Sequence, residues 1–132
     1  MNLEQALLEN IYRKSSGVRN YVKGENYNYE LYFSSSYEEK ERILKIIPGL
    51  RQRGIENLII NLKGYSGLIF VKTIRTKKGF LVELGFDSLK KGLDIWRKTE
   101  VSLEETNDIF STICVLNMLP DMRGFERVAD WK

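Results

Sequence analysis

The sequence contains no histidine, and its 132 residues include a single cysteine, Cys114. Histidine is the commonest general base and metal ligand near neutral pH. Its absence excludes Ser-His-Asp and Cys-His catalytic arrangements. The chain also cannot supply the four Cys or His ligands of a structural zinc site, so we expect no metal.

One cysteine permits no internal disulfide, and small secreted domains usually carry paired cysteines, so the sequence favours the cytosol. The N-terminus agrees, because Glu4 and Glu9 interrupt the apolar run that a signal peptide needs. The longest apolar runs, such as residues 68–71, fall far short of the roughly 20 residues that span a bilayer. We therefore predict a cytoplasmic protein without a membrane partner.

Motifs of cofactor chemistry are also missing. Neither G-x-x-x-x-G-K-[ST] nor G-x-G-x-x-G occurs, so we predict no nucleotide cofactor. Glu104 and Asp108 are spaced one helical turn apart, but acids in the first turn of a helix favour its dipole without any catalytic role. Cys114, without an assisting base, is interpreted as a small packing residue. We predict no catalytic residue and no enzymatic activity.

The N-terminal part of the chain predicts a helix, a strand and a second helix. Apolar residues at helical spacing predict the first helix over residues 2–14. Alternation of Tyr27, Tyr29, Leu31 and Phe33 on one face then predicts a strand, with these four residues facing the core. Serines 34–36 would cap the second helix, whose apolar stripe consists of Ile43, Leu44 and Ile47.

The central part changes to the period of β-strands. Strands are predicted over 58–62, 68–74, 80–86 and 93–97, which are rich in Ile, Leu, Val and Phe. The short turns between most of these runs favour antiparallel hairpins.

The strongest local signal lies at Ser102-Leu103-Glu104-Glu105, a capping-box pattern. It predicts a helix from Ser102 to about Met118, ended by Pro120. Residues 122–131 are apolar enough to dock as a short strand or a coil. The inward face of this helix is predicted to consist of Leu103, Ile109, Phe110, Ile113 and Leu116.

This order of elements predicts one α+β domain over residues 1–132. Hairpin-connected strands flanked by helices favour a mainly antiparallel sheet of about five strands, with two or three helices packed on one face.

Charge is distributed unevenly along the chain. Residues 42–98 hold 13 Lys and Arg against 4 Asp and Glu, whereas the remainder holds 8 against 14. A basic centre can form a nucleic-acid surface, on which nearby tyrosines would stack bases. It can equally be the solvated face of a sheet, where lysine prevents edge-to-edge pairing. The candidate nucleic-acid-binding residues are Lys72, Arg75, Lys77, Lys78, Lys90 and Lys91.

The C-terminal quarter, from Thr99 to Trp131, resembles bacterial toxin-immunity proteins. The resemblance rests on Val101-Ser102-Leu103-Glu104-Glu105, a helix through Ile109-Phe110, then Leu119-Pro120 and a final Phe125 to Trp131. It implies a small cytosolic α+β domain that covers or plugs a cognate toxin. Immunity proteins share no common inhibitory residues, so the resemblance assigns no role to a particular position.

These observations leave hypotheses from different classes. The first is a non-catalytic inhibitor that binds one protein partner, such as a toxin, through acids that could mimic phosphates: Glu100, Glu104, Glu105 and Asp108. A phage-encoded inhibitor of bacterial defence would present the same features. The second is a nucleic-acid-binding module that uses the basic central sheet. The third is a small-molecule-binding or enzymatic domain that uses carboxylates and tyrosines.

Overall fold

A computed structural model describes residues 26–50, 57–88 and 92–128. The helix predicted over 2–14 lies outside these ranges. The described elements, in chain order, are β1 (Asn26–Tyr32), α2 (Tyr37–Leu44), the short 3₁₀ turn η1 (Ile47–Gly49), β2 (Asn57–Lys63), β3 (Leu68–Thr76), β4 (Gly79–Ser88), β5 (Gly92–Val101), α3 (Leu103–Cys114) and β6 (Glu126–Arg127).

The described strands form one sheet in the order β1-β2-β3-β4-β5-β6. Neighbours from β2 to β5 pair antiparallel, as the short turns predicted, and β6 pairs antiparallel with β5 after the intervening α3. β1 and β2 pair parallel, with Tyr29 opposite Ile60, so the sheet is mixed and has six strands rather than about five. The physical reason is α2, because a helix between two neighbouring strands returns the chain to the same end of the sheet.

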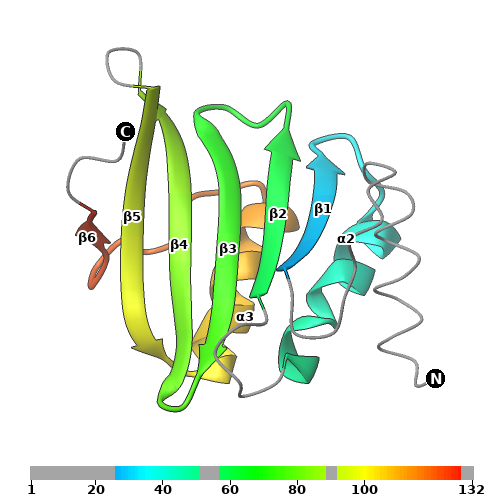
Figure 1. Cartoon of the computed structure of the whole chain (residues 1–132). Coiled ribbons are helices and arrows are strands. Elements are labelled where there is room, and N and C mark those ends of the chain that lie inside the picture. Colours follow the sequence, from blue (N-terminus) through cyan, green and yellow to red (C-terminus); the bar gives the residue numbers. More distant parts are fainter. Residues whose placement is uncertain (1–25, 51–56, 89–91, 129–132) are drawn as a thin grey trace.

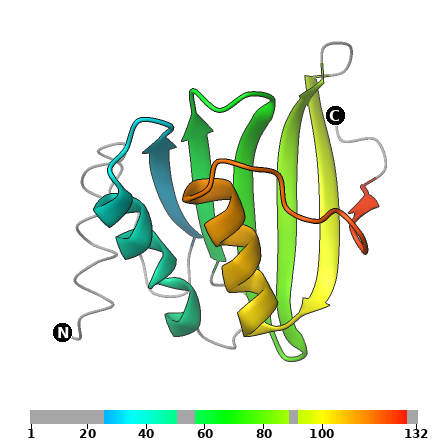
Figure 2. The ribbon, with the colours of Figure 1, turned by 180° about the vertical axis from the view of Figure 1, so that it is seen from behind.

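Both described helices cover one face of the sheet, which confirms the predicted α+β layering. α2 and α3 lie side by side in front of the strands in Figure 2, whereas Figure 1 views the opposite face. From the end of α3, the chain crosses the helix-covered side to β6 at the far edge (Figure 2). Within the described part of the chain, no helix is both long enough and apolar enough to cross a membrane.

Two serines begin the helices as predicted. The Ser36 side chain accepts a hydrogen bond from the Glu39 amide at 3.2 Å, and the Ser102 side chain accepts one from the Glu105 amide at 3.0 Å. Each bond satisfies an amide that lacks a partner within its helix. These caps place the first turns, and so decide which side chains of each helix face the sheet.

The core lies between the sheet and the two helices. The predicted stripe of α2 is buried, and so are Ile109, Phe110 and Ile113 of α3. The prediction was wrong for Leu103 and Leu116, which are 38% and 60% exposed. Leu103 is the first residue of α3. The helix ends at Cys114 rather than near Met118. Leu116 therefore lies beyond the helix, and helical spacing does not determine which way its side chain faces.

The predicted core face of β1 is partly correct. Tyr29 and Leu31 are buried, but Phe33 is 51% exposed because the strand ends at Tyr32 and the chain turns toward α2. Phe33 therefore lies at the rim of the core, where its ring contacts Tyr65 edge-on with centroids 5.4 Å apart.

Candidate protein-binding surface

The start of α3 presents acidic side chains to solvent, as predicted from helical period. Glu104 and Asp108 are exposed one helical turn apart, and Glu100, just before the helix, is exposed as well. Glu100 has a positive φ of 54°, an uncommon backbone conformation for a residue with a side chain. These three acids form the acidic start of α3, at the end of the sheet where β5 passes into the helix.

Glu105 differs from the other predicted acids because it has a basic partner. Its carboxylate accepts a short hydrogen bond from the Lys98 ammonium on β5. The reciprocal half of the capping box, in which Glu105 would accept from the Ser102 amide, gives way to this ion pair. Glu105 thus ties α3 to β5, and its charge is already partly neutralised.

The basic residues of the sheet are also engaged. On the face opposite the helices, Glu83 of β4 lies between Lys72 of β3 and Arg97 of β5 in cross-strand register. Its carboxylate accepts from Arg97 Nε at 2.7 Å and lies 3.8 Å from the Lys72 ammonium. The buried Glu83 carboxylate therefore pairs with two bases. One of them, Lys72, belongs to the predicted nucleic-acid-binding set.

Arg75, another member of that set, has a structural role. Its guanidinium donates to the backbone oxygens of Pro48 and Leu50 at 3.1 and 2.8 Å and lies over the Phe80 ring. These contacts hold the η1 turn against β3. Much of the Arg75 donor capacity is therefore used inside the molecule.

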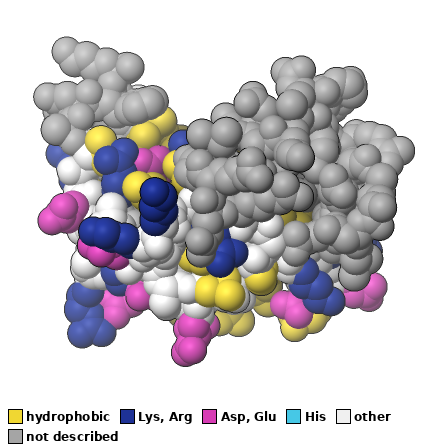
Figure 3. All heavy atoms as spheres, turned by 60° about the horizontal axis from the view of Figure 1, so that its bottom comes forward, with side chains coloured by type: hydrophobic (Ala, Val, Ile, Leu, Met, Phe, Trp, Pro, Cys, Tyr) yellow, Lys and Arg dark blue, Asp and Glu magenta, His cyan; other side chains and the backbone are white. Residues whose placement is uncertain are grey.

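Lys77 and Lys78 are exposed in the β3–β4 turn, whereas Lys90 and Lys91 lie outside the described residues. The turn packs beside the acidic start of α3, because Gly79 approaches the Val101 oxygen closely. Figure 3, which views this end, shows acidic, basic and hydrophobic side chains interspersed among the coloured atoms. Lys77 and Lys78 thus lie at the same end of the molecule as the acidic start of α3.

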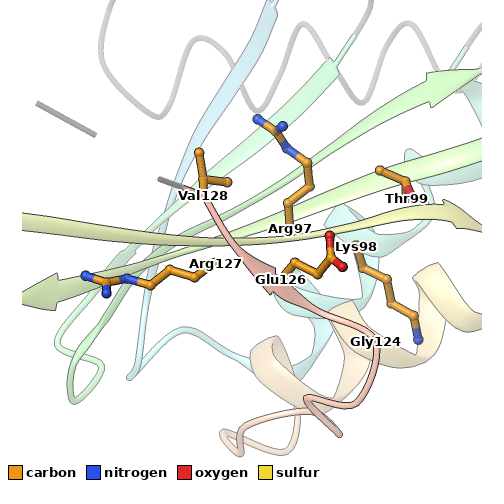
Figure 4. Close-up of a pocket in the computed structure, with 7 residues that line it drawn as sticks. All are labelled: Arg97, Lys98, Thr99, Gly124, Glu126, Arg127 and Val128. Carbon is orange, nitrogen blue, oxygen red and sulfur yellow. The ribbon is translucent and has the colours of Figure 1, made fainter. Parts of the chain in front are cut away.

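A polar pocket of about 370 Å³ lies along the outer edge of β5, next to β6. Figure 4 shows that Arg97 and Lys98, neighbours on β5, point to opposite sides of the strand, and that Arg127 points away from both. Each base also has an acidic partner, which for Arg127 is Asp94 at 2.6 Å. The three basic side chains of this pocket therefore do not converge on one point at which an anion could bind.

A second, smaller hollow lies beyond the end of α3. We call it the α3-end groove; it has a volume of about 130 Å³ and is lined by Phe33, Tyr65, Ser66, Leu68, Ile113, Asn117, Met118 and Leu119. Leu68 and Ile113 belong to the buried core, whereas Phe33, Met118 and Leu119 are more than half exposed. An apolar hollow with an exposed apolar rim is typical of protein interaction sites.

Lys40 of α2 is buried beside this groove, with only 5% of its surface exposed. Its ammonium donates to the Phe33 backbone oxygen at 3.2 Å and to Asn117 Oδ1 at 3.3 Å. It also lies 5.7 and 5.9 Å from the ring centroids of Phe33 and Tyr65. The three residues that Lys40 contacts, Phe33, Tyr65 and Asn117, all line the α3-end groove.

Cys114 lies on the inner side of the same region and is buried. Burial raises the pKa of its thiol to about 12, although the nearby Lys40 ammonium opposes the shift. The Tyr65 hydroxyl donates to the Cys114 backbone oxygen at 3.4 Å, and burial raises its pKa to about 12. Both groups stay protonated at neutral pH, so neither is an activated nucleophile.

Sequence reasoning did not identify the α3-end groove. The alternation in β1 predicts that Phe33 faces the core, and no sequence pattern distinguishes Lys40 from the other charged residues of its helix. The available signal was the segment Leu116-Asn117-Met118-Leu119 directly before Pro120, in which three of four residues are apolar and helical spacing cannot bury all three. Asn117 has a φ of 57° and turns the chain there.

Comparison with known proteins returned no matching family model, no similar curated protein and no similar solved structure. Within residues 26–50, 57–88 and 92–128, no three Cys, Asp or Glu side chains gather in a way that could hold a metal ion.

Proposed function

We propose that this chain is a non-catalytic inhibitor that binds one protein partner in the cytosol, of the kind that neutralises a bacterial toxin. The observation that carries the proposal is the exposed surface along α3. It begins with Leu103, Glu104 and Asp108 and ends with the exposed apolar residues Leu116, Met118 and Leu119.

The two ends of this surface supply different parts of a protein interface. Exposed apolar side chains give contact area that water leaves on binding, which is the main favourable term in association. Exposed acids attract a basic partner and increase the association rate. Twelve residues of α3 span about 18 Å at 1.5 Å per residue, so both ends fit within one interface of ordinary size.

Rigidity supports the same role. The Ser102 cap stabilises the first turn of α3, and the Lys98–Glu105 ion pair ties that turn to β5. At the other end, Lys40 of α2 donates to Asn117, just beyond α3. A preorganised surface loses little conformational entropy when it binds. The same surface would serve a phage-encoded inhibitor of bacterial defence, and the resemblance of residues 99–131 favours toxin immunity.

Nucleic-acid binding is the alternative, and the exposed pair Lys77 and Lys78 supports it. Against it, Lys72 and Arg97 have the acidic partner Glu83, and Arg75 holds the η1 turn. Phosphate binding depends on bases that can exchange counterions for phosphates. Bases already held by carboxylates contribute less to it.

The test is calorimetric titration against the protein encoded immediately upstream of this chain, followed by an assay of that protein's activity. We expect a one-to-one complex and loss of activity in proportion to the amount of complex. Continued loss of activity at substoichiometric amounts of this chain would indicate turnover and contradict the proposal.

A further inference from the structure

We infer that the α3-end groove binds the free C-terminus of a partner polypeptide that ends in an apolar residue, with Lys40 and Asn117 recognising its carboxylate. This inference rests on the proposed function, because it names the part of the partner that the surface along α3 would hold.

The first observation behind this inference is the buried positive charge of Lys40. Taking an ammonium out of water is costly unless an anion compensates it. The Lys40 ammonium contacts two neutral oxygens and two aromatic rings, and among the described residues no carboxylate lies within 4 Å of it. A buried positive charge of this kind favours an anion in the neighbouring groove.

Asn117 connects this charge to the groove. Its side-chain oxygen accepts from Lys40, which leaves the NH₂ group of the amide as a donor. An amide polarised at its oxygen by a cation donates more strongly from its nitrogen. Asn117 lines the groove and is exposed, so this donor can reach a ligand carboxylate even though Lys40 itself is covered.

The size of the groove limits the apolar part of the ligand. About 150 Å³ of apolar cavity is enough to hold benzene, so about 130 Å³ suits an apolar side chain no larger than Leu or Ile. The floor consists of Leu68 and Ile113, and the rim of Phe33, Met118 and Leu119. This lining excludes a charged side chain from the hollow itself.

The place of Asn117 in the groove lining favours a C-terminus. Asn117 lines the same hollow that would hold the apolar group, so a single ligand residue can fill the hollow and meet Asn117. A C-terminal Leu or Ile carries its side chain and its carboxylate on the same Cα. An internal Asp or Glu next to an apolar residue would place the two groups on different residues and further apart.

The test uses the full chain and three synthetic peptides that differ in whether they carry a carboxylate and where it lies. They are Ac-Gly-Gly-Leu with a free carboxylate, the same peptide as a C-terminal amide, and Ac-Gly-Asp-Leu-amide. Titration to about 10 mM peptide, followed by NMR chemical shifts, detects the weak binding expected of a single anchor residue. We expect the free acid to shift the signals of Tyr65, Ile113 and Leu119 and to bind at least about ten-fold more tightly than the amide.

Two variants separate recognition of the carboxylate from folding. Asn117→Asp gives Lys40 an internal counter-ion and repels a ligand carboxylate, so we expect unchanged or higher stability and loss of free-acid binding. Lys40→Met should reduce binding of the free acid to the level of the amide, whereas Lys63→Met, at an exposed lysine, should leave it unchanged. Leu119→Ser, at an exposed position, should weaken every peptide that binds.

Several results would overturn the inference. They are equal binding of acid and amide, stronger binding of the Asp-Leu amide, no shifts with any peptide, or full free-acid binding by folded Asn117→Asp protein. If these occur while the upstream protein is still bound and inhibited, the inference fails and the proposed function stands. If the free acid binds as expected but the upstream protein does not, the proposed function fails instead.

Discussion

The guanidinium of Arg97 contacts the carboxylate of Glu83 through two nitrogens, Nε at 2.7 Å and Nη2 at 2.6 Å. Glu83 is buried and also faces Lys72, so one acid holds two bases on the face of the sheet opposite the helices. Lys72 and Arg97, two bases of the basic central stretch, therefore share one acidic partner on this face.

Replacing Glu83 with Gln should therefore lower stability by about 1–3 kcal/mol, because two bases lose their common anion. Asp87→Asn, at an exposed position of the same strand, is the matched control and should change stability by less than about 0.5 kcal/mol. Urea unfolding monitored by circular dichroism measures both. Equal effects of the two substitutions would show that the Glu83 ion pairs contribute nothing.

A second pair of substitutions compares a buried residue of α3 with an exposed residue just beyond its end. Ile113 is 1% exposed, so Ile113→Ala should cost about 2–5 kcal/mol through lost burial and the cavity left behind. Leu116, which helical spacing alone also places inside, is 60% exposed, and Leu116→Ala should cost less than about 0.5 kcal/mol. A large cost at Leu116 would mean that the helix continues past Cys114 and that its inner face is the one predicted from sequence.

The β3–β4 turn depends on a glycine. A Cβ at Gly79 would lie 2.6 Å from the backbone oxygen of Val101, and its φ is 123°. Gly67 has a φ of 80° but open space around it. We expect Gly67→Ala to cost about 1–2 kcal/mol from backbone strain alone, and Gly79→Ala to cost more, because backbone must also move. Thermal unfolding of the two variants measures the difference, and equal costs would contradict the close approach.

Local patterns in the sequence predicted most of the elements. Both serine caps, the four central strands and their antiparallel pairing depend on neighbouring residues, and all were predicted correctly. The parallel pairing of β1 with β2 was missed because alternation defines a strand and not its partner. The groove was missed because it depends on contacts between distant residues, such as the hydrogen bond from Lys40 to Asn117, 77 residues further along the chain.

Stability should also fall at high pH. Burial raises the pKa of Cys114 from an ordinary value of 9.0 to about 12, and burial with a hydrogen bond to Glu39 raises that of Tyr29 above its ordinary 10.0. The unfolded chain releases these protons first, so the contribution is complete below about pH 9 and is lost as pH rises toward 12. Urea midpoints at about pH 7.5 and 10.5 should differ, and Cys114→Ala should reduce that difference. An unchanged pH dependence in Cys114→Ala would show that the thiol is not the group that titrates.

The most direct test of the protein-binding account compares two sets of charge changes on two ligands. One set is Glu104→Lys with Asp108→Lys, and the other is Lys77→Gln with Lys78→Gln. Each is titrated at two salt concentrations against the upstream protein and against a single-stranded oligonucleotide. We predict that the acid reversals weaken the protein complex, mainly through a slower association that depends on salt, while the lysine changes leave it nearly unaffected. Tight oligonucleotide binding by the unmodified chain at near-physiological salt, lost in the lysine variant, would contradict the account.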